Sequence, residues 1–154
     1  MIDLQTESFL ERTVGEFIIP SERVAHVQTG NNLEHALLVL TKSGYTAIPV
    51  LDPKYKLHGL ISSPLILDAI LGMERIEFER LEKIRVEEVM KTEIPTLTRN
   101  DAMKKAMKLL INHPFVCVVD QDGYLDGILT RRAALKQINA FLYQAAFRDE
   151  RQAP

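Results

Sequence analysis

The sequence predicts a mixed α/β fold (α+β) made of two copies of one β-α-β-β-α unit with pseudo-two-fold symmetry. The segment VLDPKYKLHGLISSPLI, residues 50–66, matches VVDQDGYLDGILTRRAAL, residues 118–135, and their Asp and Gly residues correspond at an offset of 68. Upstream, LEHALLVL at 33–40 matches MKKAMKLL at 103–110 at an offset of 70. Self-similarity of this kind indicates a duplicated structural unit. One unit of roughly 60 residues is marginally stable alone, so both copies are expected to share one domain.

The elements of the first copy follow from its hydrophobic period and its turn residues. Apolar residues recur every three to four positions after Asn32, which predicts a helix, and Asn32 itself is a favourable N-cap. The segment DPKYK separates two short apolar runs, so these runs are expected to pair as a hairpin. The expected elements, in order, are an extended segment Val24–Val27, a helix Asn32–Ser43, strands Ala47–Leu51 and Leu57–Ile61, and a second helix from Ser63.

The second copy repeats this order with its own cap and turn. Asp101 precedes the helical pattern as a candidate N-cap, and DQDGY separates the two apolar runs. The expected elements are an extended segment Ile94–Leu97, a helix Asp101–Asn112, strands Phe115–Val119 and Leu125–Leu129, and a second helix from Arg131.

The remaining segments complete the predicted organisation. The sequence between the copies has apolar residues among many charges, which indicates a partly helical connector packed on the domain. The two ends, Met1–Leu10 and Arg148–Pro154, are expected to fray. The predicted divisions are an N-terminal segment 1–12, a first repeat 13–72, a helical connector 73–85, a second repeat 86–145 and a C-terminal tail 146–154.

Composition narrows the classes of partner. A hydrophobic share of 46% and a charged share of 26% are typical of a soluble globular protein. The net charge of −2 argues against a general affinity for nucleic acid or for acidic membranes. The single cysteine, Cys117, lies in an apolar strand and suits a reducing compartment. With no signal peptide or membrane span in the sequence, we expect a cytoplasmic protein.

No arrangement of residues predicts catalysis or a resident cofactor. The four histidines are scattered, and none forms a metal-ligand spacing with Cys117 or with acidic residues. A glycine-rich phosphate loop, a Ser-His-Asp order and an H-E-x-x-H motif are all missing. We therefore expect a protein that is not an enzyme. A small phosphodiesterase remains the enzymatic alternative, without an acidic or metal-binding cluster to support it.

Two arginines stand in an unusual position. Arg131 and Arg132 fall in the expected first turn of the last helix, where free N–H groups already favour anions over cations. Arginine pairs at an exposed helix start are usually solvated. They are also tolerated there if a phosphate lies between them and the helix, because arginine is a planar donor suited to phosphate.

The repeated order of helix, AIPVLD, turn and HGLIS, and then helix, FVCVVD, turn and DGILT, resembles the tandem CBS-domain (Bateman) family over roughly residues 13–145. That resemblance implies a ligand-sensing module, usually for adenine nucleotides, that commonly forms disc-like homodimers. The segment VAHVQTGNNLEHALLVLTKSGYTAIPVLD together with TRR is similar to the stand-alone bacterial CBS proteins that bind cyclic di-AMP. These proteins are described as contacting a (p)ppGpp synthetase/hydrolase or pyruvate carboxylase when free of nucleotide.

The family architecture implies a cleft between the first strands of one repeat and the strand-to-helix corner of the other. The residues expected in the first cleft are Arg23, Ala25, Val27, Tyr45, Thr46, Ala47 and Pro49, facing Thr130, Arg131 and Arg132. The residues expected in the second cleft are Ile94, Pro95, Pro114 and Phe115, facing Ser62 and Ser63. Because only the first cleft has arginines, we expect one cyclic di-AMP per chain.

The sequence departs from the nucleotide motif of the family, in which an Asp for ribose follows the Thr or Ser by three positions. Leu65 and Ala133 stand at those places. Recognition of AMP, ADP or ATP, which is the alternative function, is therefore disfavoured. Plainer roles remain open for several residues: Thr130 and Ser62 as helix caps, Tyr45 as a core aromatic, and Arg23 as a surface charge.

Overall fold

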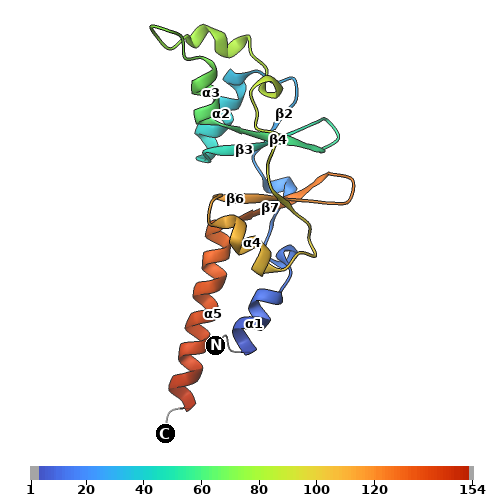
Figure 1. Cartoon of the computed structure of the whole chain (residues 1–154), viewed down its shortest axis with the longest axis vertical. Coiled ribbons are helices and arrows are strands. Elements are labelled where there is room, and N and C mark those ends of the chain that lie inside the picture. The colour runs from blue at the N-terminus through green and yellow to red at the C-terminus, as the bar shows by residue number, and fades with distance from the viewer. Residues whose placement is uncertain (1–3, 153–154) are drawn as a thin grey trace.

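A computed structural model describes residues 4–152, with side chains described between residues 6 and 147. It shows an elongated α/β molecule in which the predicted β-α-β-β-α order occurs twice, one copy above the other (Figure 1). The first copy contains β2 (Val27–Gln28), α2 (Leu33–Ser43), β3 (Ala47–Leu51), β4 (Leu57–Ser62) and α3 (Ser63–Ala69). The second contains β5 (Thr96–Leu97), α4 (Met103–Leu110), β6 (Phe115–Val119), β7 (Leu125–Thr130) and α5 (Arg131–Gln152).

The hairpins form as the sequence predicts. β3 pairs with β4 and β6 with β7, both antiparallel. Asp52 Oδ1 accepts hydrogen bonds from the backbone N–H groups of Lys54 and Lys56 at 2.8 and 3.0 Å, which closes the first turn. Asp120 closes the second turn in the same way. The repeated aspartates are therefore explained by turn geometry.

One of the two predicted helix caps is correct. Asn32 Oδ1 accepts a hydrogen bond from the backbone N–H of His35 at 2.9 Å, as an N-cap does. The prediction for Asp101 is wrong, because α4 begins at Met103 and its N-cap position is Ala102. The Asp101 carboxylate instead accepts a bond from the backbone N–H of Thr98 at 2.8 Å, within the preceding loop.

The two sheets exchange segments between the repeats. β1 (Ile19–Pro20), which comes before the first repeat's helices, pairs with β7 in a sheet of order β1-β7-β6-β5. In return, Val86 lies fully buried in the core of the first repeat, beside the sheet of order β2-β3-β4. Each core therefore contains a segment from the other half of the chain, and the two halves fold as one unit.

Repeated glycines mark the places where the exchanged segments cross the strands. A Cβ at Gly59 would lie 2.5 Å from the carbonyl oxygen of Lys91, which is too close for any side chain. At Gly127 it would overlap the carbonyl oxygen of Ile19. The Gly59 and Gly127 positions, matched at an offset of 68, thus serve the same packing role.

The connector and the ends differ from an unstructured chain. The connector includes a 3-10 helix at Phe78–Glu82, whose Leu81 is buried against the first core. Residues 4–10 and 148–152, where the sequence predicts fraying, belong to α1 (Leu4–Glu11) and α5. α1 is held because the ring of Phe9 stacks on that of Phe141 at 5.6 Å. The outermost residues, 1–3 and 153–154, lie outside the described chain.

Among the described residues, no helix combines the length and apolar character needed to cross a membrane. Even α5, the longest helix, carries polar residues along most of its length.

Candidate functional site

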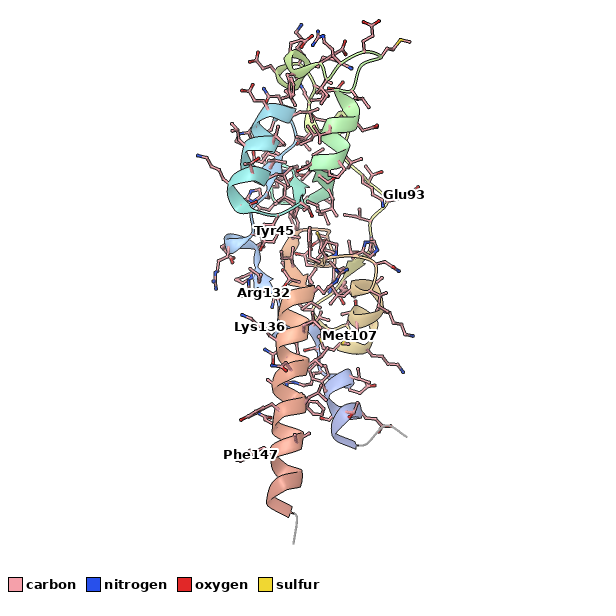
Figure 2. The ribbon with its side chains drawn as sticks, turned by 90° about the vertical axis from the view of Figure 1, so that its left-hand side faces the viewer. Tyr45, Glu93, Met107, Arg132, Lys136 and Phe147 are labelled. Atoms are coloured by element: carbon pink, nitrogen blue, oxygen red, sulfur yellow. The ribbon has the colours of Figure 1, made fainter. Side chains whose placement is uncertain are left out.

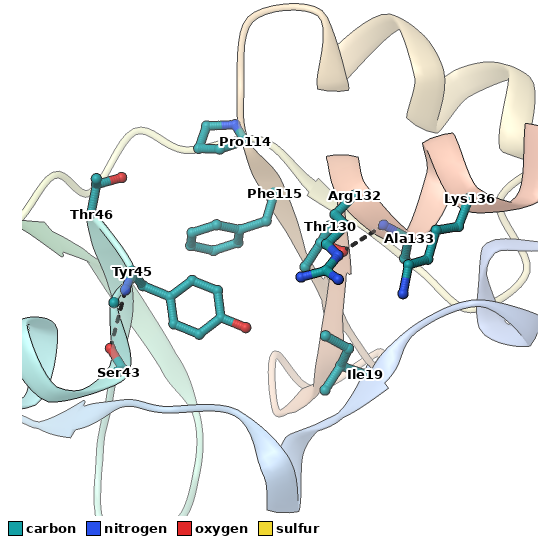
Figure 3. A pocket seen from close by; sticks show the side chains of 11 residues that line it. Ile19, Ser43, Tyr45, Thr46, Pro114, Phe115, Thr130, Arg132, Ala133 and Lys136 are labelled. Atoms are coloured by element: carbon teal, nitrogen blue, oxygen red, sulfur yellow. Dashed lines mark hydrogen bonds between the residues drawn. The ribbon is translucent and has the colours of Figure 1, made fainter. Parts of the chain in front are cut away.

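A cavity of about 560 Å³ lies between the two repeats, where the end of α2 faces the corner between β7 and α5 (Figure 3). Both repeats contribute to its lining. The lining residues are Ile19, Ser43, Gly44, Tyr45, Thr46, Pro114, Phe115, Thr130, Arg132, Ala133 and Lys136.

The first repeat forms the aromatic wall of this cavity. α2 ends at Gly44, whose φ of 78° is the left-handed conformation that glycine adopts without strain. The chain then turns Tyr45 toward the second repeat, where its ring meets that of Phe115 edge-on at a centroid distance of 6.5 Å. Tyr45 stays 38% exposed, so an apolar ring face is open to a ligand.

The second repeat forms the polar and basic wall. Thr130, the last residue of β7, accepts a hydrogen bond at Oγ1 from the backbone N–H of Ala133 at 3.0 Å. Arg132 and Lys136 extend from the first turns of α5 into the space opposite Tyr45 (Figure 3). Neither cation has an ion-pair partner among the side chains described between residues 6 and 147. A helix N-terminus with unpaired cations favours an anion.

The structure brings together four of the residues expected in the first cleft: Tyr45, Thr46, Thr130 and Arg132. Three more, Ala25, Ala47 and Pro49, line a narrow void that shares Tyr45 and Phe115 with the cavity.

Two expected residues lie elsewhere. Val27 is 1% exposed and packs within the core of the first repeat, because β2 is covered by α2. Arg23 lies at the end of a 3-10 helix, Ser21–Arg23, with an exposed side chain outside the lining. Arg23 is therefore not among the cations that line this cavity.

Arg131 does not line the cavity either. The Nε of Arg131 donates a hydrogen bond to the carbonyl oxygen of Leu110 at 2.9 Å. Its Nη2 donates a longer hydrogen bond, of 3.4 Å, to the carbonyl oxygen of Ile111. These carbonyls belong to the end of α4, where free acceptors attract a cation. Arg131 is therefore absent from the lining of this cavity, although it borders an adjoining hollow together with Arg132 and Lys136.

The residues expected in the second cleft lie at different places in the structure. Pro114 and Phe115 line the first cavity, whereas Ser62 and Ser63 are not among its lining residues. The Ser62 hydroxyl accepts a bond from the backbone N–H of Leu65 at 3.3 Å, so it caps α3.

Five lining residues were missed by sequence reasoning: Ile19, Ser43, Gly44, Ala133 and Lys136. Lys136 follows Arg132 by four positions, and this spacing puts both side chains on one helix face. The place of Lys136 in the lining could therefore have been predicted from the sequence. Ile19 carried no such signal, because it reaches the cavity through the segment exchange.

The buried thiol of Cys117 does not line the cavity. Burial raises the pKa of the Cys117 thiol to about 12, which keeps it protonated and unreactive. No group of three or more His, Cys, Asp or Glu side chains is placed to hold a metal ion among the residues that the structure describes.

A sequence-family model of the CBS domain matches this chain twice, at residues 14–72 and 86–140. The chain belongs to the CBS-domain family. This CBS pair is 59% identical over 139 residues to the cyclic di-AMP receptor B of Bacillus subtilis, covering 90% of this chain and 95% of that protein.

Solved CBS proteins have the same fold. The CbpB protein of Listeria monocytogenes in complex with c-di-AMP is 56% identical with a TM-score of 0.80, covering 85% of this chain and 98% of that one. CBSX2 in complex with AMP is 26% identical with a TM-score of 0.71, covering 84% of this chain and 97% of that one. The CBSX2 protein of Arabidopsis thaliana is a chloroplastic CBS domain-containing protein. The resemblance to the stand-alone cyclic di-AMP-binding CBS proteins, expected from the sequence, is confirmed.

Proposed function

We propose that this CBS protein is a non-enzymatic sensor that binds cyclic di-AMP in the cavity between its repeats. The observation that carries the proposal is the pairing of an open aromatic wall with unpaired cations at the start of α5. The likeness to a cyclic di-AMP receptor over 90% of the chain supports the same ligand.

The cavity offers a complementary group for each part of this ligand. Cyclic di-AMP carries two phosphodiesters, two adenines and free 2′-hydroxyls. A phosphodiester is stabilised by the planar donor fork of Arg132 and by the N-terminus of α5. An adenine face stacks against the exposed ring of Tyr45, since aromatic stacking tolerates any base. Thr46 is placed for a polar contact at the edge.

Regulation follows if the nucleotide-free form binds a target enzyme and the ligand weakens that complex. A (p)ppGpp synthetase/hydrolase and pyruvate carboxylase are the candidate targets, by resemblance to the stand-alone CBS proteins. The ligand regulates only through a difference in its affinity for the free and the target-bound protein. Pull-down of each candidate with and without cyclic di-AMP tests this step, and equal recovery in both samples would contradict it.

A homodimer is part of the same proposal, because exposed apolar side chains lie on the helical side of both repeats. They are Leu38 (54% exposed) on α2, Leu67 (46%) on α3, Ile111 (74%) at the end of α4 and Leu135 (58%) on α5. The basic residue Lys104 corresponds in the repeat to Glu34, so a head-to-tail second copy places opposite charges together. Leu135→Glu is expected to give monomers in light scattering, and a monomeric wild type would overturn the assignment.

Calorimetric titration with cyclic di-AMP, AMP and ATP tests the ligand. Wild type is expected to bind cyclic di-AMP at one per chain, and Arg132→Met to weaken binding at least about tenfold. Lys108→Met, which removes an exposed cation on α4 outside the cavity, is the matched control. Unchanged affinity in Arg132→Met would place the ligand elsewhere.

A second candidate is an energy sensor for AMP, ADP or ATP, favoured by the AMP complex of the related CBSX2. It is opposed by Leu65 and Ala133, which leave no carboxylate for the ribose at either helix start. Tighter binding of AMP or ATP than of cyclic di-AMP would establish it. Recovery of intact nucleotide after overnight incubation would separate both sensors from a phosphodiesterase.

A further inference from the structure

The first turns of α5 combine positive charges without any acidic residue beside them. Between Arg131 and Phe147 the sequence contains no Asp or Glu. Arg131 is bound to the carbonyls at the end of α4, whereas Arg132 and Lys136 line the cavity. Like charges four positions apart repel on a helix, and cations are disfavoured at its N-terminus. Both effects act against this pair, and no described side chain offsets them.

The other repeat shows that the fold does not need these cations. At the offset of 68, Pro64 and Asp68 occupy the places of Arg132 and Lys136. The corner itself has the same geometry in both repeats. Ser63 N–H donates to Thr46 O at 3.1 Å, as Arg131 N–H donates to Pro114 O at 2.8 Å.

The helix caps agree as well. Ser62 Oγ accepts from the backbone N–H of Leu65, and Thr130 Oγ1 accepts from that of Ala133. The backbone geometry is therefore the same in both repeats, but the charges differ. Lys136 stands in the place of Asp68, and Arg132 stands in the place of the uncharged Pro64. The cation pair belongs to the cavity and not to the fold.

We propose that Lys136 is the second phosphate-binding cation of the cavity, so that Arg132 and Lys136 each neutralise one phosphodiester of cyclic di-AMP. This inference rests on the proposed function. It makes the cation pair the feature that selects a ligand with two separate phosphodiesters over one with a single phosphodiester. Figure 2 shows both side chains on the same side of α5, below Tyr45.

The two cations differ in a way that suits this division. Arg132 presents a rigid fork close to the helix start, where backbone N–H groups also face an anion. Lys136 carries a compact charge on a flexible stem one turn further along, at a Cβ separation of about 5–6 Å from Arg132. One phosphate is thus bound by the helix end and arginine, and the other by lysine.

Titration of four proteins with cyclic di-AMP and with cyclic AMP tests the assignment. Cyclic AMP is the chosen probe because it has one adenine and one phosphodiester. Lys136→Met is expected to lower the affinity for cyclic di-AMP about tenfold and to reduce its preference over cyclic AMP. Lys136→Arg keeps the charge and is expected to stay within about threefold of wild type. Lys108→Met, the control, is expected to bind as wild type does.

Salt provides a readout that a purely structural role would not move. Raising the ionic strength screens each charge pair, so the affinity of Lys136→Met is expected to fall less steeply with salt than that of wild type. Lys136→Met with the affinity and salt dependence of Lys108→Met would overturn the inference and leave the proposed function intact. Failure of wild type to bind cyclic di-AMP would overturn both.

Discussion

Arg131 Nε donates a hydrogen bond to the carbonyl oxygen of Leu110 at 2.9 Å, which links the first turn of α5 to the last turn of α4. This contact explains an arginine at a helix end whose free N–H groups disfavour cations. The positive N-terminal end of α5 lies beside the negative C-terminal end of α4. The guanidinium of Arg131 contacts the carbonyls at the end of α4. The adjacent Arg132 lines the cavity.

Arg131→Met is therefore expected to destabilise the protein and to spare the ligand site. Loss of a charged hydrogen bond to helix-end carbonyls costs about 1–2 kcal/mol. For a chain of this length, thermal unfolding should shift down by roughly 3–6 °C. Calorimetric titration should give a ligand affinity close to that of wild type.

Arg132→Met is the matched comparison. The Arg132 side chain is exposed and has no hydrogen-bond or ion-pair partner in the described structure. We expect an unfolding temperature close to that of wild type and weakened ligand binding. The reverse pattern, with Arg131→Met stable but unable to bind, would show that Arg131 enters the cavity.

The crossing of Ile19 over Gly127 makes a second prediction. Gly127→Ala forces a methyl group into the carbonyl oxygen of Ile19, so the β1–β7 pairing must open. We expect a loss of about 3 kcal/mol in the free energy of unfolding, measured in urea. Gly15→Ala, whose added methyl would lie 3.1 Å from the carbonyl oxygen of Arg99, is expected to cost less. Equal stability of both variants would contradict the crossing.

Local elements were predictable from the sequence because their signals are local. β3 and β6 have the predicted bounds, since each is a short apolar run before an Asp-containing turn. The segment exchange was not predictable. β1 has two residues, too few for a period, and its partner is set by tertiary packing.

The site was predictable in outline but not in the direction of each side chain. Thr130 and Tyr45 follow from the repeat and from the end of α2. The different contacts of Arg131 and Arg132 depend on where α4 ends, and that relation lies outside the local sequence. Val27 illustrates the same limit, because alternation along a two-residue strand does not fix which face is buried.

The thiol of Cys117 is predicted not to react with thiol reagents in the native protein. Burial raises the pKa of its thiol to about 12, so little thiolate exists at pH 8. A thiol reagent should label the native protein only as fast as the core opens, and label it at once in denaturant. Lys108→Cys, which adds an exposed thiol, is the positive control and should react rapidly at one site. Rapid labelling of native wild type would contradict the buried position.

The Asp52 turn gives a prediction for acid. A hydrogen bond from His58 Nε2 at 3.1 Å, followed by the backbone N–H of Lys56, lowers the pKa of Asp52 below its ordinary value of 3.8. A carboxylate with a lowered folded-state pKa adds stability above its unfolded pKa, and this contribution is lost as pH falls through the folded value. Wild type should therefore exceed Asp52→Asn in stability at pH 6, and the difference should shrink below about pH 4.

Asp122→Asn supplies the comparison, because in the equivalent hairpin Asp122 takes part through its backbone N–H and Asp120 supplies the carboxylate. This variant removes a carboxylate from the same kind of turn and leaves the hydrogen bonds accepted by Asp120 in place. His58→Ala should remove part of the Asp52 effect at pH 6, since the imidazole is the largest cause of the lowered pKa. If unfolding in urea gives Asp52→Asn the same deficit at both pH values, the turn is stabilised by its shape alone and not by the ionised carboxylate.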